Sequence, residues 1–142
     1  MIDQLITFAS HNMILVVAIV LVSLMLLHSL VGERLRGYSS VSPSESTQMI
    51  NRDDALILDV RESNEYSEGH IINSLHIPLS GLKTRLKDLE KYKTKKVIVA
   101  CRSGHRSSQA CTTLKKEGFE QIFNLSGGVM AWESASLPLI KK

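Results

Sequence analysis

The longest apolar run in the chain is a stretch of twenty residues without a charged side chain, from Asn12 to Val31. As an α-helix this stretch would be about 30 Å long, which matches the hydrocarbon thickness of a bilayer. We therefore predict a transmembrane helix over residues 12–31, preceded by a short extracytoplasmic N-terminus over residues 1–11. A secretory signal peptide is the alternative, but it requires a basic segment before the apolar run, and Asp3 is the only charged side chain there.

Basic side chains follow the predicted span at once. Arg34 and Arg36 lie on its C-terminal side, whereas its N-terminal side has no Lys or Arg. Because basic residues beside a span favour the cytoplasmic side, we expect a single-pass protein of the inner (cytoplasmic) membrane with its C-terminal part in the cytoplasm. Residues 32–41 then form a juxtamembrane linker and residues 42–142 a separate domain. A membrane anchor of this kind would also allow the protein to bind membrane-protein partners.

Strands and helices alternate in the predicted domain. Three apolar runs rich in branched side chains, over residues 55–60, 97–101 and 121–125, are typical of buried strands. Helices are predicted between and before them, as the following signals show. An alternation of this kind indicates an α/β fold with a parallel sheet covered by helices on both faces, in which ligands bind at the carboxyl ends of the strands.

Three segments carry helical signals. Residues 42–45 (SPSE) form a capping box with proline at the first helical position, so a helix should run to about residue 51. Four leucines between Leu79 and Leu89 repeat at spacings of three and four residues and predict an amphipathic helix. A third helix fits residues 106–117 and should end at Gly118.

Composition narrows the range of functions. From residue 33 onward the chain carries 17 basic and 13 acidic side chains, a net charge of +4. This charge suits anionic small molecules or an anionic membrane surface, but it is too weak for nucleic acid. Cys101 and Cys111, the only cysteines, are too few for a disulfide framework, and cytoplasmic thiols stay reduced. No His/Cys cluster has metal-ligand spacing, and we expect no cofactor.

The segment with the clearest chemistry is Val97–Ser107, VIVACRSGHRS. It delivers Cys101 from a buried strand into a short loop that leads into a helix, so that loop amides and the helix N-terminus favour negative charge at one point. Gly104 allows a tight turn, and Arg102 and Arg106 add cationic donors. These features lower the pKa of a thiol and make it reactive. A buried core cysteine, the alternative interpretation, does not need them.

This loop resembles the C-x-x-G-x-R active-site loop of the rhodanese family. Two further segments are similar to signatures of the same family. They are Asp59-Val60-Arg61 with Glu65-Tyr66 and Gly69-His70-Ile71, and Leu125-Ser126-Gly127-Gly128 with Trp132. The resemblance extends over about residues 41–139. One departure is Asn73-Ser74, where the family usually has Gly-Ala, and we expect it to alter a loop.

The resemblance implies a rhodanese-like fold and a sulfurtransferase. In this family a cysteine thiolate, here Cys101, takes sulfane sulfur from a donor such as thiosulfate, holds it as a persulfide and passes it to an acceptor. By the same resemblance, the donor is bound by the loop residues Arg102, Ser103, Gly104, His105, Arg106 and Ser107. The expected partners are a small anionic sulfur donor and a thiol or protein acceptor, without nucleic acid.

Two other functions stay open. The chain is alternatively a membrane-tethered rhodanese-fold module that binds proteins with little or no turnover. A phosphatase or arsenate reductase is the third hypothesis. Phosphatases of this fold place arginine six positions after the nucleophile, and that position here is Ser107, one residue beyond Arg106.

The remaining motif residues have structural interpretations. We expect Asp59, Arg61 and Glu65 to tie a loop together through ion pairs rather than to act in catalysis, and His70 to form a structural hydrogen bond. The other structural positions are Gly69, Gly127, Gly128 and Trp132, interpreted as turns and a core anchor.

Two residues have two possible roles each. Cys111 lies inside a predicted helix and is expected to pack in the core, with a resolving thiol as the alternative. His105 lies in the loop and either assists the leaving group or faces solvent.

Overall fold

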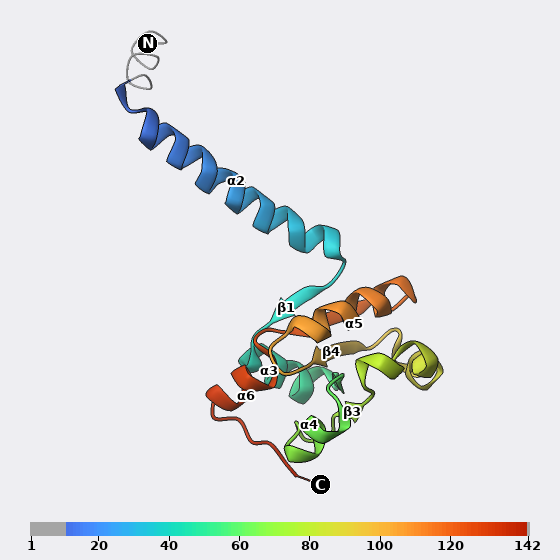
Figure 1. Cartoon of the computed structure of the whole chain (residues 1–142). Helices are drawn as coiled ribbons and strands as arrows, with labels where there is room; N and C mark the ends of the chain where they lie inside the picture. The colour runs from blue at the N-terminus through green and yellow to red at the C-terminus, as the bar shows by residue number, and fades with distance from the viewer. Residues whose placement is uncertain (1–10, 142) are drawn as a thin grey trace. The chain divides into compact units, whose positions relative to one another are not determined.

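The computed structural model describes residues 11–141, with the side chains of residues 28–31 and 33–35 excepted. Of the predicted N-terminal segment, residues 1–10 therefore lie outside the described residues. The chain has two compact units, residues 1–35 and residues 36–142, and the elements of each are labelled in Figure 1.

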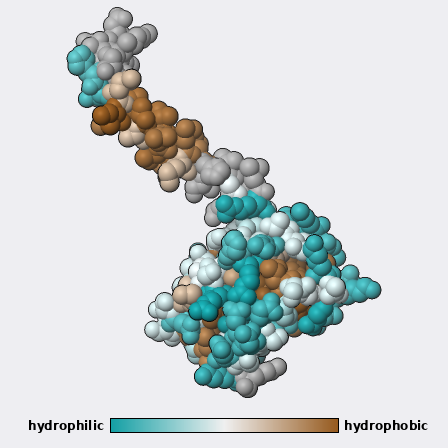
Figure 2. Space-filling model, viewed as in Figure 1, coloured by the Kyte–Doolittle hydropathy of each residue, from teal (hydrophilic) through white to brown (hydrophobic). Residues whose placement is uncertain are grey.

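Helix α2 (Met13–Arg36) makes up most of the described part of the first unit. Its large apolar side chains between Met13 and Leu27 are mostly exposed, and they form the brown surface along this helix in Figure 2. Within the described residues, no helix is both long and apolar enough to cross a membrane. The prediction of a helix is confirmed, whereas a span over residues 12–31 is not supported; residues 28–31 of that span have side chains outside the described set.

Five parallel strands form the sheet of the second unit. In chain order they are β1 (Ser39–Val41), β2 (Leu56–Asp59), β3 (Leu75–His76), β4 (Lys96–Ala100) and β5 (Gln121–Leu125). Their spatial order is β1-β5-β4-β2-β3. Strands β2, β4 and β5 correspond to the three predicted strands, and β4 pairs with β2 on one side and with β5 on the other. The carboxyl end of β4 therefore lies at the middle of one edge of the sheet.

Helices cover both faces of this sheet, as predicted. They are α3 (Pro43–Asp53), α4 (Ser63–Glu68), the 3-10 segments η1 (Leu79–Gly81) and η2 (Lys83–Tyr92), α5 (His105–Lys116) and α6 (Gly128–Ser134). One buried cluster joins Leu114 of α5 and Leu89 of η2 to one face of the sheet. A second cluster joins Trp132 of α6 and partly buried side chains of α3 to the other face. The sheet is thus the middle layer of three.

The leucine repeat does not form the predicted α-helix. Its segment is built of the 3-10 turns η1 and η2, and Arg85 inside it has a non-helical backbone (φ −109°, ψ 15°). The four leucines, Leu79, Leu82, Leu86 and Leu89, still pack into or against the cluster below α5. In a 3-10 helix side chains three positions apart lie on the same face, and the single spacing of four, from Leu82 to Leu86, spans the non-helical backbone at Arg85.

The predicted linker over residues 32–41 also differs from the structure. Helix α2 continues to Arg36, and β1 adds an edge strand to the sheet, with Ser39 opposite Phe123 and Val41 opposite Leu125. Tyr38 is buried, and its hydroxyl is hydrogen-bonded to that of Ser108 in α5. The folded domain therefore begins before residue 42.

Candidate active site

Strand β4 and helix α5 place Cys101 at the central carboxyl edge of the sheet. Successive side chains of a strand point to opposite faces, so Val97 and Val99 enter the cluster below α5 while Ile98 and Ala100 enter the other. Cys101, the next odd position, joins the α5 cluster and is only 1% exposed. The thiol is thus held against the start of the helix that follows it.

Backbone amides at the N-terminus of α6 hold the Cys101 loop by donating hydrogen bonds to two carbonyl groups of the loop. The amide of Val129 donates to the Cys101 carbonyl oxygen at 2.8 Å, and the amide of Met130 donates to that of Arg102 at 3.1 Å. The close approach requires a residue without a side chain at Gly128, where a Cβ atom would overlap the backbone of Cys101 and Arg102. This contact explains the glycine at position 128, for which the sequence predicts only a turn.

Hydrogen bonds converge on the Cys101 sulfur from the loop and from α5. The Gly104 amide donates to Sγ at 3.1 Å, and the Ser107 hydroxyl lies 3.3 Å from it. Burial alone raises the pKa of the Cys101 thiol, but the Ser107 hydroxyl and the amides of Ser107, Gly104 and Ser103 outweigh it, so that the pKa lies below its usual value. The loop therefore stabilises a thiolate.

Asn124 of β5 is a site residue that was not predicted from the sequence. Its side-chain amide donates to the Gly104 carbonyl oxygen at 3.2 Å, and Gly104 has the left-handed backbone (φ 100°) that turns its own amide toward the sulfur. The Asn124 Oδ1 atom is buried without a hydrogen-bond partner among the described residues. The signal available in the sequence was the asparagine itself, a polar residue in a largely apolar predicted strand.

Arg106 is engaged by an acidic residue of α4. Its two terminal nitrogens donate to the two carboxylate oxygens of Glu65 at 2.6 and 2.7 Å, and this pairing holds the pKa of Glu65 at about 2. In this arrangement Arg106 joins α5 to α4. The role of Arg106 in donor binding, which the family resemblance implies, stays a prediction.

The exposed positions of the loop are Arg102, Ser103 and His105. Arg102 follows Cys101 directly. The His105 ring nitrogen Nε2 lies 3.5 Å from the side-chain amide of Gln109, one turn further along α5. The Arg102 guanidinium pairs with none of the described residues, so this cation of the loop is accessible to an anion.

The first signature motif forms a buried ion pair below the loop. Nη2 of Arg61 donates to Asp59 at 2.7 Å and to the Gly69 carbonyl oxygen at 2.8 Å, and Nη1 donates to the Glu65 carbonyl oxygen at 3.2 Å. Asp59 is fully buried and Arg61 is nearly so. Arg61 thereby ties the middle of α4 and the residue after it to Asp59 of β2, and α4 in turn presents the Glu65 side chain to Arg106.

His70 and Trp132 secure the same region. His70 is buried, donates from Nδ1 to the Tyr66 carbonyl oxygen at 3.0 Å and stacks on the Tyr66 ring, whose other stacking partner is His76. The indole of Trp132 donates to the Pro138 carbonyl oxygen at 3.2 Å. The chain end is held by backbone pairing of His70 with Ile140.

Cys111 differs from Cys101 in its surroundings. It is fully buried in the cluster below α5. Burial, with a contribution from the nearby Cys101 charge, raises the pKa of Cys111 to about 12. At neutral pH this thiol stays protonated and is a poor nucleophile.

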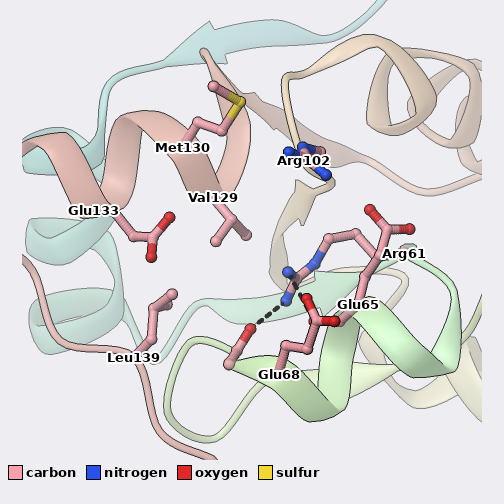
Figure 3. Close-up of a pocket in the computed structure, with 9 residues that line it drawn as sticks. Arg61, Glu65, Glu68, Arg102, Val129, Met130, Glu133 and Leu139 are labelled. Carbon is pink, nitrogen blue, oxygen red and sulfur yellow. Dashed lines mark hydrogen bonds between the residues drawn. The ribbon is translucent and has the colours of Figure 1, made fainter.

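A pocket of about 260 Å³ adjoins the Cys101 loop (Figure 3). Its lining residues come from α4 and the segments directly before and after it, from the loop, from α6 and from the C-terminal segment. They are Arg61, Glu65, Glu68, Gly69, Arg102, Val129, Met130, Glu133 and Leu139. Among the described residues no group of His, Cys, Asp and Glu side chains has the arrangement of a metal site.

Comparison with known proteins agrees with this fold and loop. The chain matches the model of the rhodanese-like domain over residues 42–135. It is 34% identical over 99 residues to a sulfurtransferase of Allochromatium vinosum, covering 70% of this chain and 91% of that protein. It is 36% identical over 102 residues to the uncharacterized protein YibN of Escherichia coli K12, covering 71% of each.

A solved structure gives the same result for the fold. The rhodanese-related protein of Thermoplasma volcanium superposes with a TM-score of 0.67 at 32% identity, over 74% of this chain and 100% of that one. The range matched by the family model contains Cys101 and the whole of its loop. The chain therefore belongs to the rhodanese-like domain family.

Proposed function

We propose that the protein is a rhodanese-type sulfurtransferase, which moves sulfane sulfur from a donor such as thiosulfate to a thiophilic acceptor through a persulfide on Cys101. The observation that carries this proposal is the Cys101 thiol, which lies at the carboxyl end of the central strand with its pKa lowered by loop hydrogen bonds. A relative that bears the name sulfurtransferase supports it.

The reaction has two displacement steps. The Cys101 thiolate attacks the sulfane sulfur of thiosulfate, a Cys101 S–S bond forms, and the S–S bond of thiosulfate breaks as sulfite leaves with the electron pair. An acceptor thiolate then attacks the outer sulfur, and Cys101 departs as a thiolate. The Gly104 and Ser107 groups that stabilise the starting thiolate also stabilise Cys101 as the leaving group in the second step.

The intermediate makes the proposal testable by intact-mass measurement. After treatment with thiosulfate the protein should gain the mass of one sulfur atom and release one equivalent of sulfite. Peptide mapping should place the sulfur on Cys101 and not on Cys111, whose raised pKa keeps it protonated. Absence of any added sulfur, together with stable binding of a partner protein, would instead favour a binding module with little turnover.

We further propose that the residue 12–31 segment attaches the protein to the inner membrane, with the sulfur-transfer domain in the cytoplasm. The exposed apolar side chains between Met13 and Leu27 support this proposal, because such a surface is unfavourable in water. Alkaline carbonate extraction of cell membranes should leave the full chain in the membrane fraction. Its quantitative release into the supernatant would contradict a membrane-spanning anchor.

A further inference from the structure

The charges that line the pocket beside the Cys101 loop are only partly neutralised within the protein. Arg61 is paired with Asp59, and Glu65 is paired with Arg106. The other three charged side chains of the lining, Arg102, Glu68 and Glu133, form no hydrogen bond or ion pair with any residue that the structure describes. The pocket therefore presents one cation and two carboxylates to a ligand.

The unpaired charges stand on different elements around an apolar wall. Glu68 ends α4, Glu133 belongs to α6 and Arg102 belongs to the loop, and Figure 3 shows Glu133 and Arg102 on opposite sides of the pocket. The apolar residues of the lining are Val129, Met130 and Leu139. The pocket volume of about 260 Å³ is enough for a small amino acid derivative.

This arrangement selects a ligand of mixed charge. A dianion such as thiosulfate would meet two carboxylates besides Arg102, so these charges suit it less well than they suit a ligand of mixed charge. A molecule with an ammonium group and a carboxylate would match both Glu68/Glu133 and Arg102, while its short apolar part would contact Met130.

On the basis of the proposed sulfur transfer, we propose that this pocket binds the acceptor, and that the acceptor is a small amino-acid-type thiol whose ammonium group is recognised by Glu68 and Glu133. Arg102 pairs with its carboxylate. After losing its proton to solvent, the acceptor sulfur attacks the outer sulfur of the Cys101 persulfide. The bond between the two persulfide sulfurs breaks, its electron pair returns to Cys101, and a small-molecule persulfide leaves.

Matched acceptors test the ammonium recognition. Cysteamine and 2-mercaptoethanol differ in the ammonium group, and the ratio of their kcat/KM values for unloading the persulfide measures recognition of that group. In the double variant E68Q/E133Q this ratio should fall by about 3- to 10-fold relative to the wild type, the effect of losing two partly exposed ion pairs. Both proteins are assayed with the same two thiols, so comparing their ratios cancels the difference in intrinsic reactivity between cysteamine and 2-mercaptoethanol.

A matched control and a non-reacting ligand complete the experiment. The variant E90Q/E117Q removes two exposed carboxylates outside the pocket lining and should keep the wild-type ratio. S-methylcysteine, which cannot accept sulfur, should bind the unloaded wild type measurably more tightly than E68Q/E133Q in NMR titrations.

The two readouts separate the two proposals. An unchanged acceptor ratio in E68Q/E133Q, with normal persulfide formation, overturns the ligand assignment and leaves sulfur transfer intact. Failure of the wild type to form a persulfide overturns sulfur transfer, while the S-methylcysteine titration still decides the ligand class. Equal binding of S-methylcysteine to the wild type and E68Q/E133Q overturns the ligand class.

Discussion

Replacing Cys101 by serine is expected to lower the transfer of sulfur from thiosulfate to a thiol by at least about a thousandfold, because a hydroxyl at this position neither ionises near neutral pH nor forms a persulfide. The substitution is close to isosteric, and the buried position beside Ser107 and the Gly104 amide offers hydrogen-bond partners to the new hydroxyl. The fold should therefore persist. Steady-state transfer rates and circular dichroism of the two proteins measure both effects.

The second cysteine supplies the control for this experiment. Cys111→Ala removes a protonated core thiol and should retain most of the transfer rate, with a modest loss of stability from the small cavity. Persulfide loading of the wild type should rise with pH as Cys101 ionises and level off below the usual thiol range, because its pKa is lowered. Survival of transfer in Cys101→Ser would show that Cys101 is not the sulfur carrier, and loss of transfer in Cys111→Ala would show that Cys111 is also required.

The part of the site that was predictable from the sequence is the part that is local in the chain. A buried strand, a cysteine, a glycine and a helix follow one another within residues 97–107, so their relative geometry is set by short-range backbone constraints. The capping box at the start of α3 is local in the same sense, and Ser42 and Glu45 form it as predicted. Asn73, which replaces a usual family glycine, adopts a left-handed backbone (φ 59°) that asparagine tolerates well.

The part that was not predictable depends on residues far apart in the chain. Glu65 meets Arg106 across 41 positions and Asn124 meets Gly104 across 20, and no spacing rule encodes such pairs. The short edge strands β1 and β3 gave no apolar run because they are held by one neighbouring strand each. The leucine repeat indicated which face is buried but not which kind of helix carries it.

Gly128→Ala is expected to destabilise the domain by about 2–5 kcal/mol, the sum of two effects. The backbone at Gly128 has φ 61°, a conformation that costs an alanine about 1–2 kcal/mol. The added Cβ would also overlap the carbonyl group of Cys101 and the backbone of Arg102, which requires the loop and α6 to move apart. Urea unfolding followed by the fluorescence of Trp132, the only tryptophan, measures the change.

Two other glycines separate these effects. Gly118 has a similarly positive φ of 86° with no atom within 4 Å of an added Cβ, so Gly118→Ala should show the backbone cost alone. Gly81 has neither a positive φ nor a near neighbour, and Gly81→Ala should be close to neutral. Equal midpoints for the Gly128 and Gly118 variants would mean that the overlap is relieved without cost.

The folded fraction of Gly128→Ala should also load sulfur slowly. The Val129 and Met130 amides that hold the Cys101 and Arg102 carbonyl groups lie directly after Gly128. Moving α6 away releases those carbonyl groups, and the loop amides lose the orientation that lowers the Cys101 pKa. The pH dependence of thiol alkylation should therefore shift upward in Gly128→Ala and stay unchanged in Gly118→Ala. A shift in neither variant would show that the thiolate does not depend on the contact between α6 and the loop.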